Sequence, residues 1–325
     1  MTLRLSRELI RSRPFAALAS VCSVAALAAP APAIAGGAPT GSGGGGIAKP
    51  TVVLVHGAFA DASGWDGVVE RLQRDGYPVI APANPLRGLA SDSAYIASVL
   101  KSVKGPIILA GHSYGGAVIG EAAAGNRNVK ALVYISAFMP DKGETLGALG
   151  AKFRGSELNP ALRQVPFQDG DGTTGTDLYI KPDKFHQVFA ADLAASTAAQ
   201  MSATQRPISA TAFTEKARGA AWKSIPSWFL VATKDRAIAP DLERFEAKRS
   251  GSHTIEVNSS HVAMISHPGT VTSLILDAIR TEASGTPSLA TTGSTTSATG
   301  LIGVGAIVAG VGLIVAVRRH EARDR

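Results

Sequence analysis

The sequence predicts an α/β fold built on a mainly parallel sheet with helices on both faces. Apolar, β-branched runs such as residues 51–56 (TVVLVH) are typical of strands that are buried on both sides. These runs alternate with segments of helical length between residues 49 and 283, as in successive βαβ units. A body of about 235 residues suits a single domain of this class.

The expected elements follow one another along the chain. The first strand, 51–56, leads to a helix that starts at Ser63, where Asp66 would complete a capping box, and that ends at Gly76. Later strands are expected at residues 79–82, 106–111, 130–137, 227–233 and 254–257. Later helices are expected at residues 91–103, 115–124, 240–250 and 268–283.

One segment, residues 140–226, interrupts this alternation. It shows only scattered short helical patterns and X-Pro breaks. We expect it to form a cap inserted over the carboxyl ends of the strands, where open α/β sheets bind ligands. The run DGDG at 169–172 resembles a calcium loop but has Ile180 where such a loop needs its final glutamate, so we expect a surface turn.

The amino-terminal end has the organisation of a secretory signal peptide. Residues 1–35 contain four arginines, then an apolar run at 15–29, then the small residues of the sequence AIA at 33–35. The apolar run is too short to span a membrane. Residues 36–48 form a Gly-rich linker to the domain at 49–283. Because the one cysteine, Cys22, lies in this signal, thiol catalysis and thiolate metal sites are excluded for the mature chain.

The carboxyl-terminal end predicts attachment to the cell surface. A Ser/Thr-rich stalk at 284–299 precedes an apolar stretch of 18 residues at 300–317, which reaches the lower limit for a membrane-spanning helix. The basic tail at 318–325 is expected on the cytoplasmic side of the membrane.

The stalk contains the pentapeptide LATTG at 289–293. With the apolar stretch and basic tail that follow, it resembles a Gram-positive cell-wall sorting signal of the LAXTG type. Ala290 stands where the commoner pattern has proline. The resemblance implies that a sortase cuts between Thr292 and Gly293 and joins the chain to cell-wall peptidoglycan. The alternative is an uncut membrane anchor through 300–317, with the same domain outside.

The positive charge of the chain is concentrated at its two ends. The formal net charge is +7, and the terminal segments hold 8 of the 32 basic and 3 of the 25 acidic residues. The body keeps 24 basic against 22 acidic residues. A nearly neutral body argues against nucleic acid as a partner.

The pentapeptide GHSYG at 111–115 matches the pattern G-x-S-x-G. It lies between an expected buried strand and an expected helix, the context in which this pattern forms a nucleophile elbow. Such a turn holds the serine, here Ser113, in a strained backbone conformation with its hydroxyl exposed. The alternative is a structural turn in which the glycines only give the backbone room. The strand–turn–helix context favours the nucleophile.

A serine hydroxyl needs a neighbouring base, and in this arrangement the chain order is serine, acid, histidine. Asp235 follows the penultimate expected strand and His261 follows the last one, so they are the candidate acid and base. Asp141, after the strand at 130–137, is the alternative acid. The sequence has no H-E-x-x-H motif, and the predicted chemistry requires no metal and no other cofactor.

The oxyanion of a tetrahedral intermediate needs two N–H donors. One is the backbone N–H of Tyr114, the residue after the nucleophile. The loop after the first strand is expected to supply the other, because Gly57 lets the backbone turn sharply and present the N–H of Ala58. Phe59 is the alternative donor in this loop.

Four stretches, HGAFADASGW, GHSYGG, the late Asp235 and SSHVAMISHP, together resemble the α/β-hydrolase superfamily. The resemblance covers residues 51–282. Within the superfamily, the motifs most resemble those of the esterase-like branch, which includes plant methylesterases, hydroxynitrile lyases and small bacterial esterases. It implies the α/β-hydrolase fold with an inserted cap, and the same nucleophile, acid, base and oxyanion donors. Hydroxynitrile lyases of this branch have threonine at the position of Gly57 and lysine at that of Val262, so the resemblance favours hydrolysis through an acyl-enzyme.

The expected function is therefore that of a secreted, surface-anchored serine hydrolase acting on small to medium, mostly apolar carboxylic esters. Phe59 and Phe138 are candidate residues of the substrate pocket, although either could be ordinary core. Two alternatives stay open: a cofactor-free haloperoxidase or perhydrolase with the same triad, and a non-catalytic binding protein that keeps the hydrolase fold.

Overall fold

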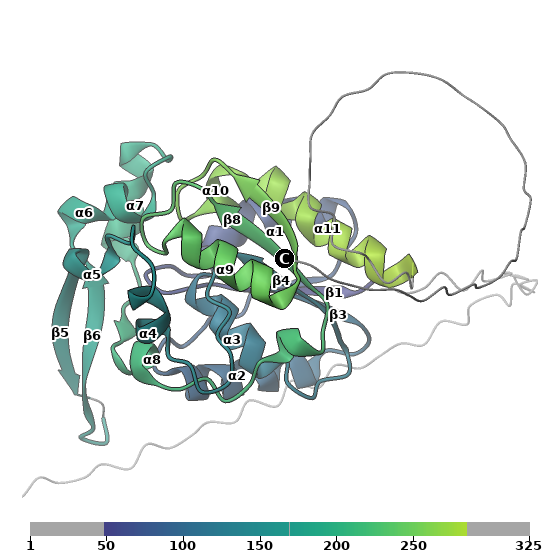
Figure 1. Ribbon diagram of the computed structural model, residues 1–325, viewed down its shortest axis with the longest axis horizontal. Helices are drawn as coiled ribbons and strands as arrows, with labels where there is room; N and C mark the ends of the chain where they lie inside the picture. The colour runs from purple at the N-terminus through teal and green to yellow at the C-terminus, as the bar shows by residue number, and fades with distance from the viewer. Residues whose placement is uncertain (1–48, 169, 285–325) are drawn as a thin grey trace, which may run out of the picture. The chain divides into compact units, whose positions relative to one another are not determined.

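The computed structural model describes residues 49–168 and 170–284. They build a six-stranded sheet in the order β2-β1-β3-β4-β8-β9, in which every neighbouring pair is parallel (Figure 1). The strands of this sheet are β1 (Thr51–Val55), β2 (Val79–Ile80), β3 (Ile107–His112), β4 (Val129–Ile135), β8 (Ser227–Ala232) and β9 (His253–Val257).

Helices cover both faces of this sheet. Every residue of β3 and β8 is buried, as continuous apolar runs require, so neither face of these strands meets solvent. Helix α1 packs against α11, α2 packs against α3, and α9 packs on β8. These helices and the short α10 are α1 (Asp66–Arg74), α2 (Leu89–Ser102), α3 (Tyr114–Ala122), α9 (Pro240–Ser250), α10 (Ala263–Ser266) and α11 (Pro268–Ser284). The predicted α/β fold with a mainly parallel sheet is confirmed.

The strand register brings the functional loops to one edge of the sheet. Val55 pairs with Gly111, so the loop after β1 and the turn after β3 begin side by side. Ala232 pairs with Val257, so the loops after β8 and β9 also begin side by side. Because all six strands are parallel, these four loops leave the sheet at the same edge.

The start of the first helix differs from the prediction. Asp61, and not Ser63, is the capping residue: its carboxylate accepts the backbone N–H of Ser63 at 2.8 Å and the Ser63 hydroxyl at 2.6 Å. A short 3₁₀ turn, η1 (Ala62–Trp65), then leads into α1 at Asp66. The expected capping box between Ser63 and Asp66 is therefore wrong, because the carboxylate two residues upstream already takes the N–H of Ser63. The other predicted strands and helices agree with the observed ones to within two residues at each end.

The inserted segment between β4 and β8 contains a second sheet that the sequence did not reveal. This antiparallel sheet has the order β5-β6-β7, and Figure 1 shows its β5–β6 hairpin extending away from the central sheet. Strand β5 is largely exposed and includes Pro166, so neither an apolar run nor regular alternation marks it. The elements of the segment are α4 (Leu146–Ala151), α5 (Leu158–Ala161), β5 (Leu162–Gln168), β6 (Thr174–Ile180), α6 (Pro182–Phe189), α7 (Ala195–Thr204), β7 (Ile208–Ser209), α8 (Thr211–Thr214) and η2 (Ala221–Lys223).

Several predictions concern residues outside the described part of the chain. They are the signal peptide at 1–35, the linker at 36–48, the stalk with Thr292 and Gly293, the apolar stretch at 300–317 and the basic tail. Within the two described ranges, no helix is both long enough and apolar enough to cross a membrane.

Candidate active site

Ser113 lies at the turn between β3 and α3, in a backbone conformation that non-glycine residues rarely adopt. Its φ of 54° and ψ of −124° carry a strain of about 1–3 kcal/mol. The flanking glycines are required by close backbone contacts: a Cβ on Gly111 would lie 2.6 Å from the Gly115 oxygen, and one on Gly115 would lie 2.5 Å from the Val55 oxygen. This is the geometry of a nucleophile elbow.

Asp235 and His261 form a buried pair. Asp235 follows β8, His261 follows β9, and Asp235 Oδ2 accepts a hydrogen bond from His261 Nδ1 at 2.5 Å. Asp235 Oδ1 accepts the backbone N–H groups of Ala237 at 2.6 Å and Ile238 at 2.9 Å, which fixes the plane of the carboxylate. With its proton held on Nδ1, the imidazole presents an unprotonated Nε2, the atom that acts as a general base toward serine.

The residue before the nucleophile ties this pair to the elbow. His112 Nε2 donates to the backbone oxygen of His261 at 3.0 Å, and the two imidazole ring centroids are 4.7 Å apart. Burial holds the pKa of His112 well below its usual range, so His112 stays neutral beside the base. The structure therefore pairs Asp235 with His261 and holds the loop of His261 against His112, the residue before Ser113.

The alternative acid lies elsewhere. Asp141 Oδ2 is 2.6 Å from Lys223 Nζ in a partly exposed ion pair.

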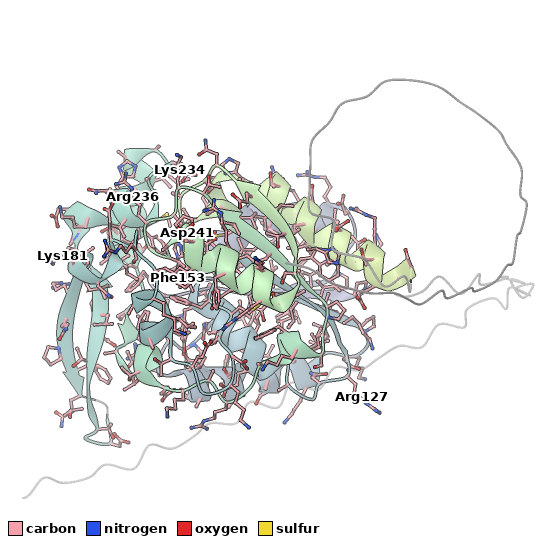
Figure 2. The ribbon with its side chains drawn as sticks, viewed as in Figure 1. Arg127, Phe153, Lys181, Lys234, Arg236 and Asp241 are labelled. Atoms are coloured by element: carbon pink, nitrogen blue, oxygen red, sulfur yellow. The ribbon has the colours of Figure 1, made fainter. Side chains whose placement is uncertain are left out.

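The residues on either side of Asp235 point outward. Lys234 and Arg236 are exposed, and Figure 2 shows both at the surface. Asp235 alone of these three side chains turns inward, toward His261.

The two expected oxyanion donors have free N–H groups. Among the described residues, the backbone N–H groups of Ala58 and Tyr114 have no hydrogen-bond partner. The N–H of Phe59, the alternative donor, is already bonded to the Arg206 oxygen at 3.1 Å. Gly57 allows the loop to reach the elbow, because a Cβ there would lie 2.6 Å from Ser113 Cβ. The structure thus leaves Ala58 as the free donor of this loop.

Residues that sequence reasoning missed hold these donors in place. His56 Nε2 accepts the backbone N–H of Asn84 at 2.9 Å, so its proton is on Nδ1, which donates to the Gly57 oxygen at 2.9 Å. Burial lowers the pKa of His56 to about 4 and keeps this tautomer neutral. On the other side, the Tyr114 phenol donates to the buried Asp92 carboxylate at 2.8 Å. The sequence did contain a signal for His56, because it is a polar residue directly after a buried strand.

The cap touches the catalytic histidine directly. Phe189, at the end of α6, packs on the His261 ring with centroids 5.0 Å apart and on Phe59 at 6.2 Å. Asp192, just beyond α6, accepts hydrogen bonds from the Ser259 hydroxyl at 3.0 Å and from the Ser260 N–H at 3.0 Å. The loop that carries His261 is therefore held by the cap as well as by the sheet.

The two predicted pocket residues line two separate hollows, and no triad residue contributes to either of them. Phe138 donates its N–H to the Ser113 oxygen at 3.1 Å and lines a hollow of about 330 Å³. This hollow lies under α4 and α5, and its apolar lining includes Phe153, labelled in Figure 2, and Ile238. Phe59 lines a hollow of about 250 Å³ beside Met264 and under α7.

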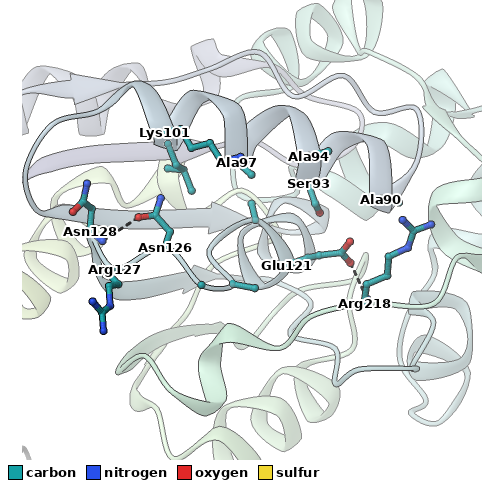
Figure 3. Close-up of a pocket in the computed structure, with 14 residues that line it drawn as sticks. Ala90, Ser93, Ala94, Ala97, Lys101, Glu121, Asn126, Arg127, Asn128 and Arg218 are labelled. Atoms are coloured by element: carbon teal, nitrogen blue, oxygen red, sulfur yellow. Dashed lines mark hydrogen bonds between the residues drawn. The ribbon is translucent and has the colours of Figure 1, made fainter.

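A further hollow lies away from the triad. It has a volume of about 700 Å³ and is formed by α2, the end of α3 and the loop that follows (Figure 3). Alanines and charged side chains line it, and Glu121 there accepts the backbone N–H of Arg218 at 2.9 Å. No residue of the triad contributes to it. Within the described ranges, no three His, Cys, Asp or Glu side chains cluster closely enough to hold a metal ion.

Comparison with known proteins identifies the family of the chain. Residues 52–274 match the Alpha/beta hydrolase family, so the chain belongs to that family. The predicted α/β-hydrolase fold is therefore confirmed.

Three relatives illustrate the likeness. A carbendazim hydrolyzing esterase of Nocardioides sp. (strain SG-4G) is 33% identical over 110 residues, which are 30% of this chain and 46% of that esterase. The structure of polyneuridine aldehyde esterase has a TM-score of 0.62 at 19% identity, over 71% of this chain and 99% of that one. The structure of a pyrethroid hydrolase from Sphingobium faniae JZ-2 has a TM-score of 0.58 at 21% identity, over 72% of this chain and 99% of that one. At these identities the two structures establish the fold alone.

Proposed function

We propose that this protein is a serine hydrolase that cleaves small to medium, mostly apolar carboxylic esters through an acyl-enzyme. The observation that carries the proposal is the buried Asp235–His261 pair, held against the elbow that carries Ser113. The names of the three relatives, two esterases and a pyrethroid hydrolase, support the same reaction class.

In the first half of the reaction, Ser113 Oγ attacks the ester carbonyl carbon and His261 Nε2 takes the serine proton. Asp235 stabilises the imidazolium that forms. The carbonyl oxygen becomes an oxyanion, which accepts hydrogen bonds from the N–H groups of Ala58 and Tyr114. As the intermediate collapses, His261 returns its proton to the departing alkoxide and the alcohol leaves. Water then attacks the acyl-enzyme by the same steps and releases the acid.

The lining of the two hollows supports an apolar substrate of limited size. The hollow at Phe138 has aromatic and aliphatic side chains, and the hollow at Phe59 adds two methionines. Their volumes, about 330 and 250 Å³, are near the lower end of the range for small-molecule sites.

The test is a profile of hydrolysis rate against acyl-chain length, run on the wild type and on Ser113→Ala. The proposal expects a preference for short and medium chains and no turnover by the variant. Acetate with hydrogen peroxide forms a second arm, in which peracid formation faster than ester hydrolysis would favour a perhydrolase. Binding of esters without turnover would favour a non-catalytic protein.

We also propose that the enzyme is exported and attached to the cell surface, with the sortase site between Thr292 and Gly293. The support is the order of the sequence features: a signal at 1–35, the LATTG pentapeptide, the apolar stretch at 300–317 and a basic tail. Muramidase digestion of the wall should release protein that ends at Thr292. Intact protein in the membrane fraction, unchanged by Thr292→Ala, would replace the sortase with a plain membrane anchor.

A further inference from the structure

A third carboxyl group lies behind the Asp235–His261 pair. Glu243, on α9, is fully buried and lies next to the Asp235 loop, because Asp235 donates its backbone N–H to the Ala232 oxygen at 3.1 Å and Glu243 bonds to the N–H of the same residue. Its Oε2 accepts the backbone N–H of Ala232 at 2.9 Å. Its other oxygen, Oε1, is buried and receives no hydrogen bond from any donor in the described ranges. Two buried carboxyl groups in neighbouring positions favour a proton on one of them, because two buried carboxylates would repel each other.

Among the described residues, the charged groups that act most strongly on Glu243 are acidic. The titratable groups that face it are Asp235, from the loop after β8, and Glu246, one turn further along α9. The nearby guanidinium of Arg249 is directed elsewhere, since it lies 2.9 Å from Glu144 and 3.6 Å from Glu246. Burial and then the negative charge of Asp235 hold the pKa of Glu243 well above its usual range. A raised pKa favours the neutral form of Glu243, which can donate as well as accept.

Asp235 has room for one more donor. A carboxylate offers about four lone-pair positions. Three of those on Asp235 receive the N–H groups of Ala237, Ile238 and His261. We propose that Glu243 is a positioning residue that fills the fourth, donating a hydrogen bond to the Asp235 carboxylate and extending the triad to Ser113–His261–Asp235–Glu243. This proposal rests on the proposed function, because it assigns Asp235 the role of the triad acid.

The hydrogen bond from Glu243 should change how easily His261 is protonated. It draws negative charge away from Asp235, so the His261 imidazolium is held less tightly than by a fully exposed carboxylate charge. Loss of the donor should therefore make His261 easier to protonate and move the acid limb of the kcat/KM profile to higher pH. If Glu243 were instead ionised, its neutralisation would remove a negative charge near His261 and move the acid limb to lower pH.

The experiment measures kcat/KM against pH for three variants beside the wild type. Glu243→Gln keeps both functions of the side chain, since its carbonyl can accept from Ala232 and its amide can donate to Asp235. Glu243→Met keeps the length and removes the donor. Glu246→Gln is the matched control, a buried carboxyl of the same helix that does not contact Asp235.

We expect Glu243→Gln and Glu246→Gln to leave the acid limb in place. Glu243→Met should lower kcat about tenfold and raise the midpoint of the acid limb by about one pH unit. A downward shift in Glu243→Gln, or an unchanged limb and kcat in folded Glu243→Met, would overturn the proposal. If Glu243→Met does not fold, Glu243→Gln decides alone: an unchanged acid limb supports a neutral Glu243, and a downward shift overturns the proposal.

A readout without turnover separates this proposal from the proposed function. The Nδ1–H proton of His261 should give a strongly downfield NMR signal, whose position depends on the charge of Asp235. That signal should move in Glu243→Met and stay in Glu243→Gln, whether or not any ester is hydrolysed. Wild-type protein that neither hydrolyses esters nor reacts at Ser113 would refute the serine hydrolase, whereas an unmoved signal in both Glu243 variants would refute only the role of Glu243.

Discussion

A methyl group added to Gly57 should displace the loop that carries the Ala58 N–H. In Gly57→Ala the new Cβ would lie 2.6 Å from Ser113 Cβ and 2.8 Å from the His112 oxygen. Ordinary contact between carbon atoms is about 3.5–4.0 Å, so the loop must withdraw from the elbow by about 1 Å. An oxyanion hydrogen bond of about 3 Å then becomes about 4 Å long and is lost.

The loss of one oxyanion donor reduces kcat by about a hundredfold or more. Gly57→Ala should therefore lower kcat by that factor with a much smaller change in KM, because the donor acts on the transition state. Overpacking should also cost about 1–3 kcal/mol of unfolding free energy. Steady-state kinetics and urea unfolding measure the two effects. Gly269→Ala is the matched control, since its Cβ would meet nothing closer than 3.9 Å. Folded Gly57→Ala that keeps kcat within about threefold of wild type would refute this placement of the oxyanion hole.

Four further predictions concern single residues. Asp235→Asn should reduce kcat by several orders of magnitude while Asp141→Asn leaves it nearly unchanged, and steady-state kinetics that reverse this ranking would make Asp141 the acid. Tyr114→Phe removes a hydrogen bond to a buried carboxylate and should cost about 1.5–3 kcal/mol in urea unfolding. Asp192→Ala frees the loop before His261 and should lower kcat while the thermal midpoint stays nearly unchanged. A lowered thermal midpoint with an unchanged kcat would mark a purely structural contact. Burial raises the pKa of Glu246 to about 8, from a value of about 4.5 in the unfolded chain. The wild type should therefore lose unfolding free energy as the pH rises from about 4.5 to about 8. Urea unfolding at several pH values should show that Glu246→Gln removes this part of the loss.

The strands and most helices could be predicted because burial on both faces leaves a direct mark on the sequence. Runs such as TVVLVH can only be satisfied in the middle of a covered sheet, and the loops that follow parallel strands must then meet at one edge. Placing Ser113, Asp235 and His261 together required only that topology. The β5–β6 hairpin could not be found in this way, because β5 is mostly exposed and its apolar residues are only partly buried.

What the sequence could not indicate depends on contacts between distant segments. Glu243 and Glu246 look like ordinary polar residues of a surface helix, and only the packing of α9 against β8 buries them. The choice between Ala58 and Phe59 as oxyanion donor depends on the carbonyl of Arg206, which lies in the cap. Pairings of this kind have no local signature, since each partner is typical of its own surroundings.

The central claim is that Ser113 is the nucleophile, and covalent labelling tests it most directly. A fluorophosphonate reacts only with a serine that a neighbouring base activates. Mass spectrometry of the digested wild-type protein should find one adduct, on the peptide that contains Ser113. No adduct should form on Ser113→Ala, and very little on His261→Ala. An adduct on any other residue, or labelling that survives Ser113→Ala, would contradict the account.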